Sequence, residues 1–210
     1  GSIKMVLNML MLNLPVEKIG GEMYELLTMA NRTTEDVFSL LDNLLKWTKS
    51  QIGNLNVVYQ DVDAVEVVDS VIDVFNMVAG LKKITIREEK PEKLPVCTDI
   101  DMLKTIIRNL LSNAIKFSNE NSEVLVKMEE QGDTVVVSVK DSGCGIDEEG
   151  QQKLLHTDTH FSTFGTNNEE GSGLGLLLCQ DFAVKIGGKL WFTSKEGEGS
   201  TFYFSIPLKK

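Results

Sequence analysis

One stretch of the chain, RNLLSNAIKFS at residues 108–118, combines two carboxamides and a lysine at helical spacing. Asn109 and Asn113 are four residues apart and Lys116 follows three later, so a helix would project all three from roughly one side. Burying such groups in an otherwise apolar helix is costly unless something pairs with them. Asparagine oxygens can face Mg²⁺ or its waters, and a lysine can meet phosphate. The stretch indicates either a site for a metal-bound phosphate or a polar helix face in solvent.

A second motif, DSGCGID at residues 141–147, places a carboxylate next to two glycines. Asp141 lies at the expected end of a strand, where it could accept a hydrogen bond from the exocyclic amine of a purine. Gly143 and Gly145 permit the close backbone approach that the wall of a ligand site requires. A simple turn is the alternative, because this pattern by itself is weak.

Two further glycine-rich motifs follow, EEGSGLGL at residues 169–176 and GEGSTF at 197–202. The glycines of the first precede an apolar helix, whose N-terminal N–H groups could bind phosphate oxygens. A dinucleotide-binding fold lacks support because no strand-first βαβ context is present. A P-loop is excluded because no Gly-Lys-Ser/Thr follows.

The two histidines of the chain lie four residues apart in HTDTH, as His156 and His160. On a helix this spacing would place both imidazoles on one face, as in H-E-x-x-H zinc sites. A zinc site also needs a third ligand, usually a fourth, and a rigid frame. We therefore interpret them as solvent-facing residues, with His160 a candidate for occasional phosphate contact.

Hydrophobic periodicity predicts the elements that must position these motifs. The mixture of helices and strands without strict alternation predicts an α+β fold, with a mixed sheet that carries helices on one face. The expected helices cover residues 64–80, 100–117 and about 174–186, and the expected strands lie at 55–63, 83–89, 95–99, in two segments of 123–141 and in two segments of 189–207.

The first 52 residues follow a different, heptad rhythm. Mostly apolar residues from Met23 to Thr48 recur at alternating steps of four and three, a pattern typical of a helix that packs against other helices. Pro15, Gly20 and Gly21 interrupt the pattern, which predicts a hairpin with a short first arm. Such a hairpin either packs on a partner chain or covers itself with the C-terminal domain.

Composition excludes several classes of protein. The formal net charge of −10 argues against broad binding to nucleic acid or to anionic membranes. Cys97, Cys144 and Cys179 are odd in number and widely spaced, which favours a reducing compartment, so we expect a cytoplasmic protein. No apolar run approaches the roughly 20 residues needed to span a bilayer, so no direct membrane contact is expected. A parent protein anchored in the inner membrane remains compatible with this.

In their order along the chain, the motifs resemble the N, G1, F, G2 and G3 boxes in the ATP-binding domain of sensor histidine kinases. NLLSNAIKFS, GSGLGLLLC and GEGSTFYFSIP are close to the wording of that family, and LLDNLLKWTKSQIG resembles the end of its dimerisation and phosphotransfer hairpin. The resemblance implies two domains, a partial helical hairpin at 1–54 and a catalytic ATP-binding domain at 55–210. It also implies a two-layer α/β sandwich of the Bergerat type for the second domain.

The resemblance assigns roles to individual residues. Asn109 and Lys116 would act in catalysis, with Asn109 and Asn113 holding Mg²⁺ against the triphosphate of ATP and Lys116 contacting phosphate. Asp141 would bind the adenine amine, with help from Thr201 through water. Phe161 of the F box would belong, with Phe164, to a mobile lid that closes over ATP. The remaining nucleotide contacts would come from the G1 and G2 boxes, namely Gly143, Gly145, Ile146, Gly171, Gly173, Leu174 and Gly175.

By the same resemblance, the parent protein would transfer the γ-phosphoryl group of ATP to a histidine and then to an aspartate in the receiver domain of a response regulator. It would form a homodimer through the hairpin. No histidine occurs in residues 1–155, so we expect a fragment cut behind the phosphoacceptor, or else a degenerate kinase. The alternatives are a non-catalytic nucleotide-binding interaction module and an ATP-hydrolysing clamp similar to gyrase.

Overall fold

The computed structural model describes residues 56–155 and 174–208, together with a few isolated helical positions nearer the N-terminus. The chain divides into two compact units, Gly1–Lys49 and Ser50–Lys210. The described positions of the first unit are all helical. They are Leu27, Ala30, Thr34, Leu41, Leu44, Leu45 and Thr48. The rest of the predicted hairpin, including its turn, lies outside the described residues.

The second unit is built on a five-stranded sheet in the order β2-β4-β5-β7-β6. Strands β2 and β4 run parallel, whereas the other neighbouring pairs are antiparallel. The predicted mixed sheet is therefore confirmed. The strands are β2 (Thr85–Glu89), β4 (Glu123–Gln131), β5 (Thr134–Lys140), β6 (Leu190–Lys195) and β7 (Gly199–Pro207). A separate two-stranded sheet pairs β1 (Gln60–Asp63) with β3 (Pro95–Thr98).

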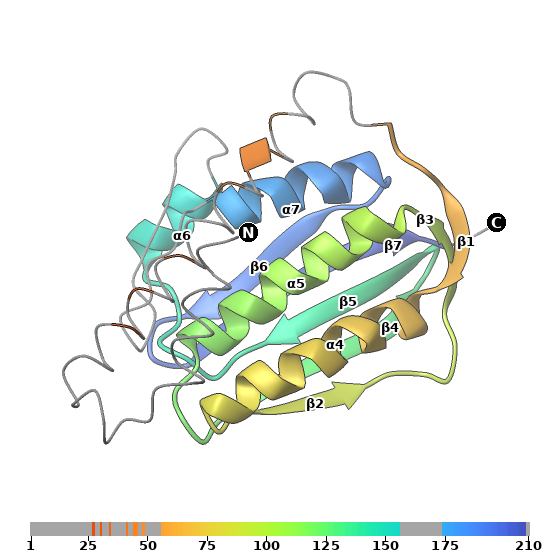
Figure 1. Cartoon of the computed structure of the whole chain (residues 1–210). Helices are drawn as coiled ribbons and strands as arrows, with labels where there is room; N and C mark the ends of the chain where they lie inside the picture. Colours follow the sequence, from red (N-terminus) through yellow and green to blue (C-terminus); the bar gives the residue numbers. More distant parts are fainter. Residues whose placement is uncertain are drawn as a thin grey trace. The chain divides into compact units, whose positions relative to one another are not determined.

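Three helices cover one face of the five-stranded sheet, with α5 lying between α4 and α7 (Figure 1). They are α4 (Ala64–Leu81), α5 (Ile100–Phe117) and α7 (Leu174–Lys185). A fourth helix, α6 (Glu148–Leu155), follows the DSGCGID motif. Among the helices that the structure describes, none has the length and apolarity to cross a membrane.

Helices α4 and α5 begin in the same way, each with an aspartate as its N-cap. Asp63 and Asp99 have nearly identical backbone angles, φ −85°, ψ 116° and φ −86°, ψ 116°. Asp63 accepts a hydrogen bond from the Val65 N–H, and Asp99 accepts bonds from two N–H groups in the first turn of α5. These side chains satisfy N–H groups that have no partner inside the helix, which fixes where each helix starts.

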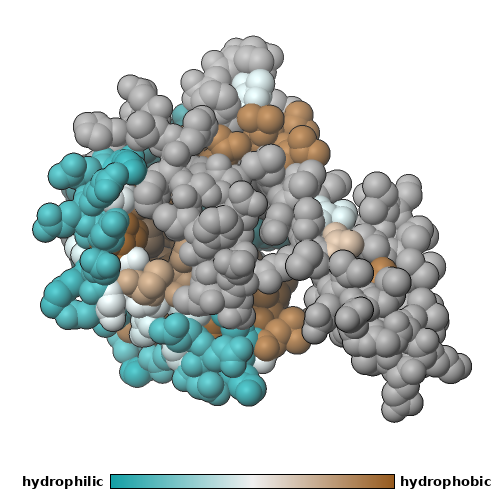
Figure 2. Space-filling model, turned by 90° about the vertical axis from the view of Figure 1, so that its left-hand side faces the viewer, coloured by the Kyte–Doolittle hydropathy of each residue, from teal (hydrophilic) through white to brown (hydrophobic). Residues whose placement is uncertain are grey.

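The core lies between the three helices and the sheet. It is formed by the inward-facing residues of β4, β5 and β7 and by the apolar sides of the helices, of which Leu103, Leu111, Leu178 and Phe204 are fully buried. Other apolar side chains remain at the surface, where Figure 2 shows hydrophobic residues next to hydrophilic ones on one face of the molecule. Several of them belong to the C-terminal half of α4.

Two elements differ from the sequence-based prediction. Strand β1 begins at Gln60 rather than at residue 55, because it pairs with the four residues of β3 only and the Val58 N–H donates to the Asp99 carboxylate. Helix α6 has no counterpart in the prediction. Its sequence is mostly polar, and an ion pair between Lys153 and Glu149 spans one turn.

Candidate functional site

The candidate site contains a buried carboxylate, Asp141, which directly follows β5. The residue is only 4% exposed. Its Oδ1 accepts hydrogen bonds from the Gly143 N–H at 3.0 Å and from the Ser200 N–H at 3.2 Å. Both bonds hold the same oxygen, so the carboxylate is fixed in orientation while Oδ2 keeps its capacity to accept a bond from a ligand.

Burial also sets the electrostatics of Asp141. Desolvation raises the pKa of its carboxyl group above the usual value, and the hydrogen bonds from the Gly143 and Ser200 backbones oppose that rise. The hydrogen bonds therefore compensate only part of the cost of burying the charged carboxylate. A donor supplied by a ligand would relieve part of this desolvation cost, which makes Asp141 a candidate for specific recognition.

The glycine at position 143 allows two parts of the site to touch. A Cβ atom built on Gly143 would lie 2.0 Å from the backbone oxygen of Phe117, at the end of α5. An isolated β-bridge joins Ser118 to Gly143 at the same place. The last turn of α5 and the loop after β5 are therefore in direct backbone contact, which no other residue type at position 143 would permit. Gly145 lies in the same loop, with φ +66°.

The polar side of α5 faces the start of α7. The amide Nδ2 of Asn109 donates to the Thr105 backbone oxygen at 2.9 Å, which orients the side chain. A Cβ on Gly175 would lie 2.6 Å from Asn109 Oδ1, so glycine leaves room for the carboxamide. The sequence predicted a phosphate contact for Gly175, and the structure adds this packing reason, which spacing along the chain could not indicate.

The other two candidate residues of α5 lie farther toward its C-terminus. Asn113 and Lys116 are both half-buried. The Lys116 ammonium lies 5.0 Å from the centre of the Phe117 ring, in cation–π geometry. The spacing argument thus placed Asn109, Asn113 and Lys116 on one helix, as the structure has them.

Ile146 is held by residues that the sequence did not single out. Its N–H donates to Ser194 Oγ at 2.9 Å, and its carbonyl oxygen accepts a bond from Gln151 Nε2 at 2.7 Å. Ser194 lies on β6 and Gln151 on α6, so the unpredicted helix fixes the loop that carries Gly145 and Ile146. No local sequence signal connects Ile146 with Ser194, which lies 48 residues away.

Thr201 lies in β7, and its predicted contact with adenine through water stays a prediction. It pairs with Lys140 and Thr193 in the sheet, and successive residues of a strand point to opposite faces. The preceding residue, Ser200, is buried and contacts Asp141 through its backbone N–H. Of the two hydroxyl residues in GEGSTF, Ser200 is therefore the one that the structure brings to Asp141.

Part of the predicted site lies outside the described residues. Phe161, Gly171, Gly173 and the two histidines lie outside the described residues, whereas Leu174 begins α7 and is buried.

Within residues 56–155 and 174–208, no group of three His, Cys, Asp or Glu side chains could hold a metal ion. Among the described residues, Asn109 and Asn113 offer a divalent cation neutral oxygens, which ligand phosphates would complete. That donor set suits Mg²⁺, which is commonly bound through few protein groups and substrate phosphates.

Comparison with known proteins identifies the group to which this arrangement belongs. Residues 98–210, more than half of the chain, match the family described as histidine kinase-, DNA gyrase B- and HSP90-like ATPases. The chain belongs to this ATPase family. The match begins in β3 and includes α5, Asp141 and the final strands, so it covers every described residue of the site.

Within the ATPase family, the chain is similar to sensor histidine kinases. It is 30% identical over 171 residues to the adaptive-response sensory kinase SasA of Rippkaea orientalis, which covers 80% of this chain and 43% of that protein. It is 28% identical over 186 residues to the sensor histidine kinase WalK of Bacillus subtilis, covering 88% of this chain and 30% of the relative. The chain thus spans less than half the length of these curated relatives.

Solved structures agree with this assignment. The catalytic domain of histidine kinase ThkA superposes with a TM-score of 0.62 at 31% identity, over 72% of this chain and 96% of that domain. The histidine kinase AdeS of Acinetobacter baumannii gives a TM-score of 0.70 at 19% identity over 100% of this chain and 95% of that one, which supports the fold alone. The predicted family and fold class, the catalytic region of a sensor histidine kinase with an α+β architecture, are confirmed.

Proposed function

We propose that this chain binds Mg·ATP and, within its parent protein, transfers the γ-phosphoryl group to a histidine. In this reaction the bond between the γ-phosphorus and the bridging oxygen of ADP breaks, a phosphorus–nitrogen bond to the imidazole forms, and the imidazole loses its proton. The observation that carries the proposal is the geometry of Asp141. Its carboxylate is buried and anchored through one oxygen, next to a helix that presents Asn109, Asn113 and Lys116.

Asp141 would select the base. The 6-amino group of adenine can donate a hydrogen bond to Oδ2, whereas guanine carries an oxygen at that position and would place acceptor against acceptor. Leaving the buried carboxylate unpaired, or facing another acceptor, costs binding free energy of about 1–3 kcal/mol. Because Ser200 contacts Asp141, we assign to Ser200 a supporting role beside the one that the sequence suggested for Thr201.

Residues of α5 and α7 would bind the phosphates. Asn109 and Asn113 supply neutral oxygens for Mg²⁺, and Lys116 supplies a cation for phosphate. The chemistry that a bound Mg²⁺ supplies is neutralisation of charge on the β- and γ-phosphates. The N-terminus of α7, with Leu174 and Gly175, would add backbone N–H groups, joined by Gly171 and Gly173.

We further propose the arrangement implied by the relatives for the rest of the chain. Residues 1–54 would form part of a helical hairpin that makes the parent a homodimer, and Phe161 would belong to a lid over the nucleotide. The phosphoryl group would pass from the histidine to an aspartate of a receiver domain. The chain's own imidazoles, His156 and His160, belong to the proposed lid segment. The acceptor would therefore be a histidine of the helical hairpin in the parent protein.

Calorimetry with ATP, ADP and GTP tests the nucleotide site. We expect binding of ATP and ADP in the presence of Mg²⁺, with weaker binding of GTP. The substitution Asp141→Ala should remove the preference for ATP, because the acceptor for the adenine amine is lost. Asp73→Ala on the exposed side of α4 serves as the control and should leave the affinities unchanged. Equal affinities of the unmodified chain for ATP and GTP would refute the assignment.

Transfer of labelled phosphate tests the reaction. Incubated with labelled ATP and Mg²⁺ alone, the chain should not gain an acid-labile, base-stable label. Addition of a hairpin with a phosphoacceptor histidine should produce that label on the hairpin, and Asn109→Ala should abolish it. Nucleotide binding without any transfer would favour the non-catalytic interaction module instead. Stable labelling of His160, lost in His160→Gln, would contradict the proposed lid.

A further inference from the structure

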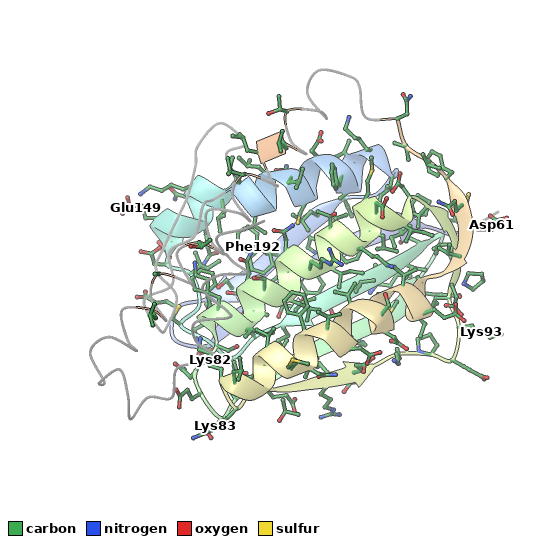
Figure 3. All side chains as sticks on the ribbon, in the orientation of Figure 1. Asp61, Lys82, Lys83, Lys93, Glu149 and Phe192 are labelled. Carbon is green, nitrogen blue, oxygen red and sulfur yellow. The ribbon has the colours of Figure 1, made fainter. Side chains whose placement is uncertain are left out.

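A buried lysine outside the proposed site, Lys82, follows helix α4 and holds the end of a different helix, α5. Lys82 follows the last residue of α4 and is only 7% exposed. Its Nζ donates to the backbone oxygens of Ile115 at 3.1 Å and of Lys116 at 2.8 Å, in the last turn of α5. Figure 3 labels Lys82 and its neighbour Lys83 where α4 ends.

Charge and hydrogen bonding both favour this position for a cation. The last carbonyl groups of a helix have no donors within it, and the helix dipole makes this end negative. A buried ammonium is costly unless acceptors compensate its desolvation, and the two carbonyl groups do so here. Lys82 therefore acts as a side-chain cap supplied to α5 by a different helix.

The backbone that carries Lys82 is itself fixed. The Lys83 N–H donates to the Gly80 oxygen at 3.1 Å, and the Ile84 N–H donates to the Ala79 oxygen at 2.9 Å. This pair of bonds is the Schellman arrangement, which satisfies the last carbonyl groups of α4 and reverses the chain. Lys82 thus extends from a well-defined helix end, not from a loop with many conformations.

The turn that Lys82 holds is the one that contacts the loop after β5. The Phe117 backbone oxygen occupies the space that a Cβ atom on residue 143 would need, and Ser118 forms a β-bridge with Gly143. The Gly143 N–H in turn donates to Asp141 Oδ1. A continuous series of contacts therefore leads from the Lys82 ammonium, through the end of α5, to the carboxylate proposed to read the base.

We propose that Lys82 is a positioning residue for base recognition, because it fixes the last turn of α5 and through it Gly143 and Asp141. This inference rests on the proposed function only in taking the ligand of Asp141 to be a nucleotide base. Without the ammonium, the last turn of α5 loses two hydrogen bonds, and Gly143 loses a fixed surface against which to pack. Asp141 then keeps its burial and the bond from the Ser200 N–H, but it loses the fixed bond from the Gly143 N–H that completes its orientation.

The substitution Lys82→Met, which removes the charge and keeps the length of the side chain, tests this role. Partial unfolding lowers the apparent affinity for every nucleotide by the same factor, because each binds only the folded fraction. The ratio of the ATP and GTP affinities is insensitive to that effect. We expect this ratio to fall about tenfold in Lys82→Met, a change typical of one misplaced buried hydrogen bond.

Two controls separate positioning from stability. Lys90→Met also removes an ammonium group with two oxygen partners, those of Asp69 and Glu88, but these lie on α4 and β2. Ile72→Val weakens the packing of the fully buried side of α4. Both variants should retain the ratio of the ATP and GTP affinities. If Lys82→Met also retains this ratio, the role of Lys82 is only structural and the proposal is overturned. Lys82→Gln, which keeps a donor, replaces Lys82→Met if the latter does not fold.

Amide hydrogen exchange without nucleotide gives a second readout that is independent of the proposed function. In Lys82→Met, the Gly143 N–H should exchange faster while the Met102 N–H, at the opposite end of α5, keeps its rate, because local opening affects only its own region. Equal acceleration of both amides would indicate general destabilisation and refute the proposal. If the unmodified chain shows no preference for ATP but Gly143 responds as expected, the proposed function fails and the positioning contact stands.

Discussion

Helices α4 and α5 have the same length and the same type of N-cap, yet they bury their apolar residues very differently. Each has 18 residues and starts from an aspartate. In α5, buried side chains occur from Met102 to Ile115. In the second half of α4, by contrast, Met77 is 80% exposed and Leu81 is 87% exposed.

The difference follows from the neighbours of each helix. Helix α5 lies between α4 and α7 and rests on the sheet, so most of its circumference is covered (Figure 1). Helix α4 lies beside α5 and next to β2 at the edge of the sheet. Burial therefore depends on position within the layer of helices, and an apolar sequence does not by itself predict a covered face.

Truncation of a buried leucine on α5 should have the largest effect on stability. Leu111 is fully buried, so Leu111→Ala should lower the free energy of unfolding by about 2–5 kcal/mol through lost burial and a residual cavity. The same truncation on α4, Leu81→Ala, should change it by no more than about 0.5 kcal/mol. Unfolding in denaturant measures both values. A large cost for Leu81→Ala would mean that this end of α4 is covered in solution.

Removal of the two N-caps should produce a smaller, graded difference. Asp99 accepts bonds from the N–H groups of Asp101 and Met102 through Oδ1, and from the Val58 N–H through Oδ2. Asp63 accepts two bonds, from the N–H groups of Val65 and Leu94. We expect Asp99→Ala to cost about 2 kcal/mol and Asp63→Ala about 1.5 kcal/mol, because Asp99 loses one bond more. Thermal and denaturant unfolding provide the comparison. A cost of Asp63→Ala equal to or above that of Asp99→Ala would show that the additional bond of Asp99 contributes nothing to stability.

The end of α4 should tolerate, and even favour, a glycine. Lys83 has φ +56°, a left-handed conformation that is unfavourable for residues with a side chain. We expect Lys83→Gly to raise the free energy of unfolding by about 0.5 kcal/mol. Glycine removes the strain of the left-handed conformation, and this gain exceeds the entropic cost of a more flexible unfolded chain. Lys93→Gly, at an exposed position without a positive φ, is the matched control and should lower it. Destabilisation by both variants would exclude relief of strain at Lys83.

The helices and strands with clear periodicity were predictable from the sequence. The predicted helix at 100–117 has the observed bounds of α5, because Asp99 provides a cap and the apolar residues recur at helical spacing. Helix α6 escaped prediction because its eight residues are largely polar and include Gly150. The predicted start of β1 was too early because the Val58 N–H donates to the side chain of Asp99, 41 residues away, and not to a neighbouring strand.

The site was predictable only as far as single motifs allow. Residue types and spacing identified Asn109, Asn113, Lys116 and Asp141, and their ligand-binding roles remain proposals. Sequence could not indicate that Ser200 contacts Asp141. Nor could it indicate that Lys82 reaches the end of α5, since such contacts depend on how separate elements pack in three dimensions.

The parallel pairing of β2 with β4 has a consequence for the order of folding. Strands β4 and β5 form a hairpin around Gly132, which has φ +63°, so they can pair as soon as a two-residue turn closes. Strand β2 joins the same sheet only across a connection that includes β3 and α5. Loop closure over this distance carries a larger entropic cost, so the hairpin should assemble early and the edge strand should dock late. During that interval β4 presents an unpaired edge, which can associate with another chain before folding is complete.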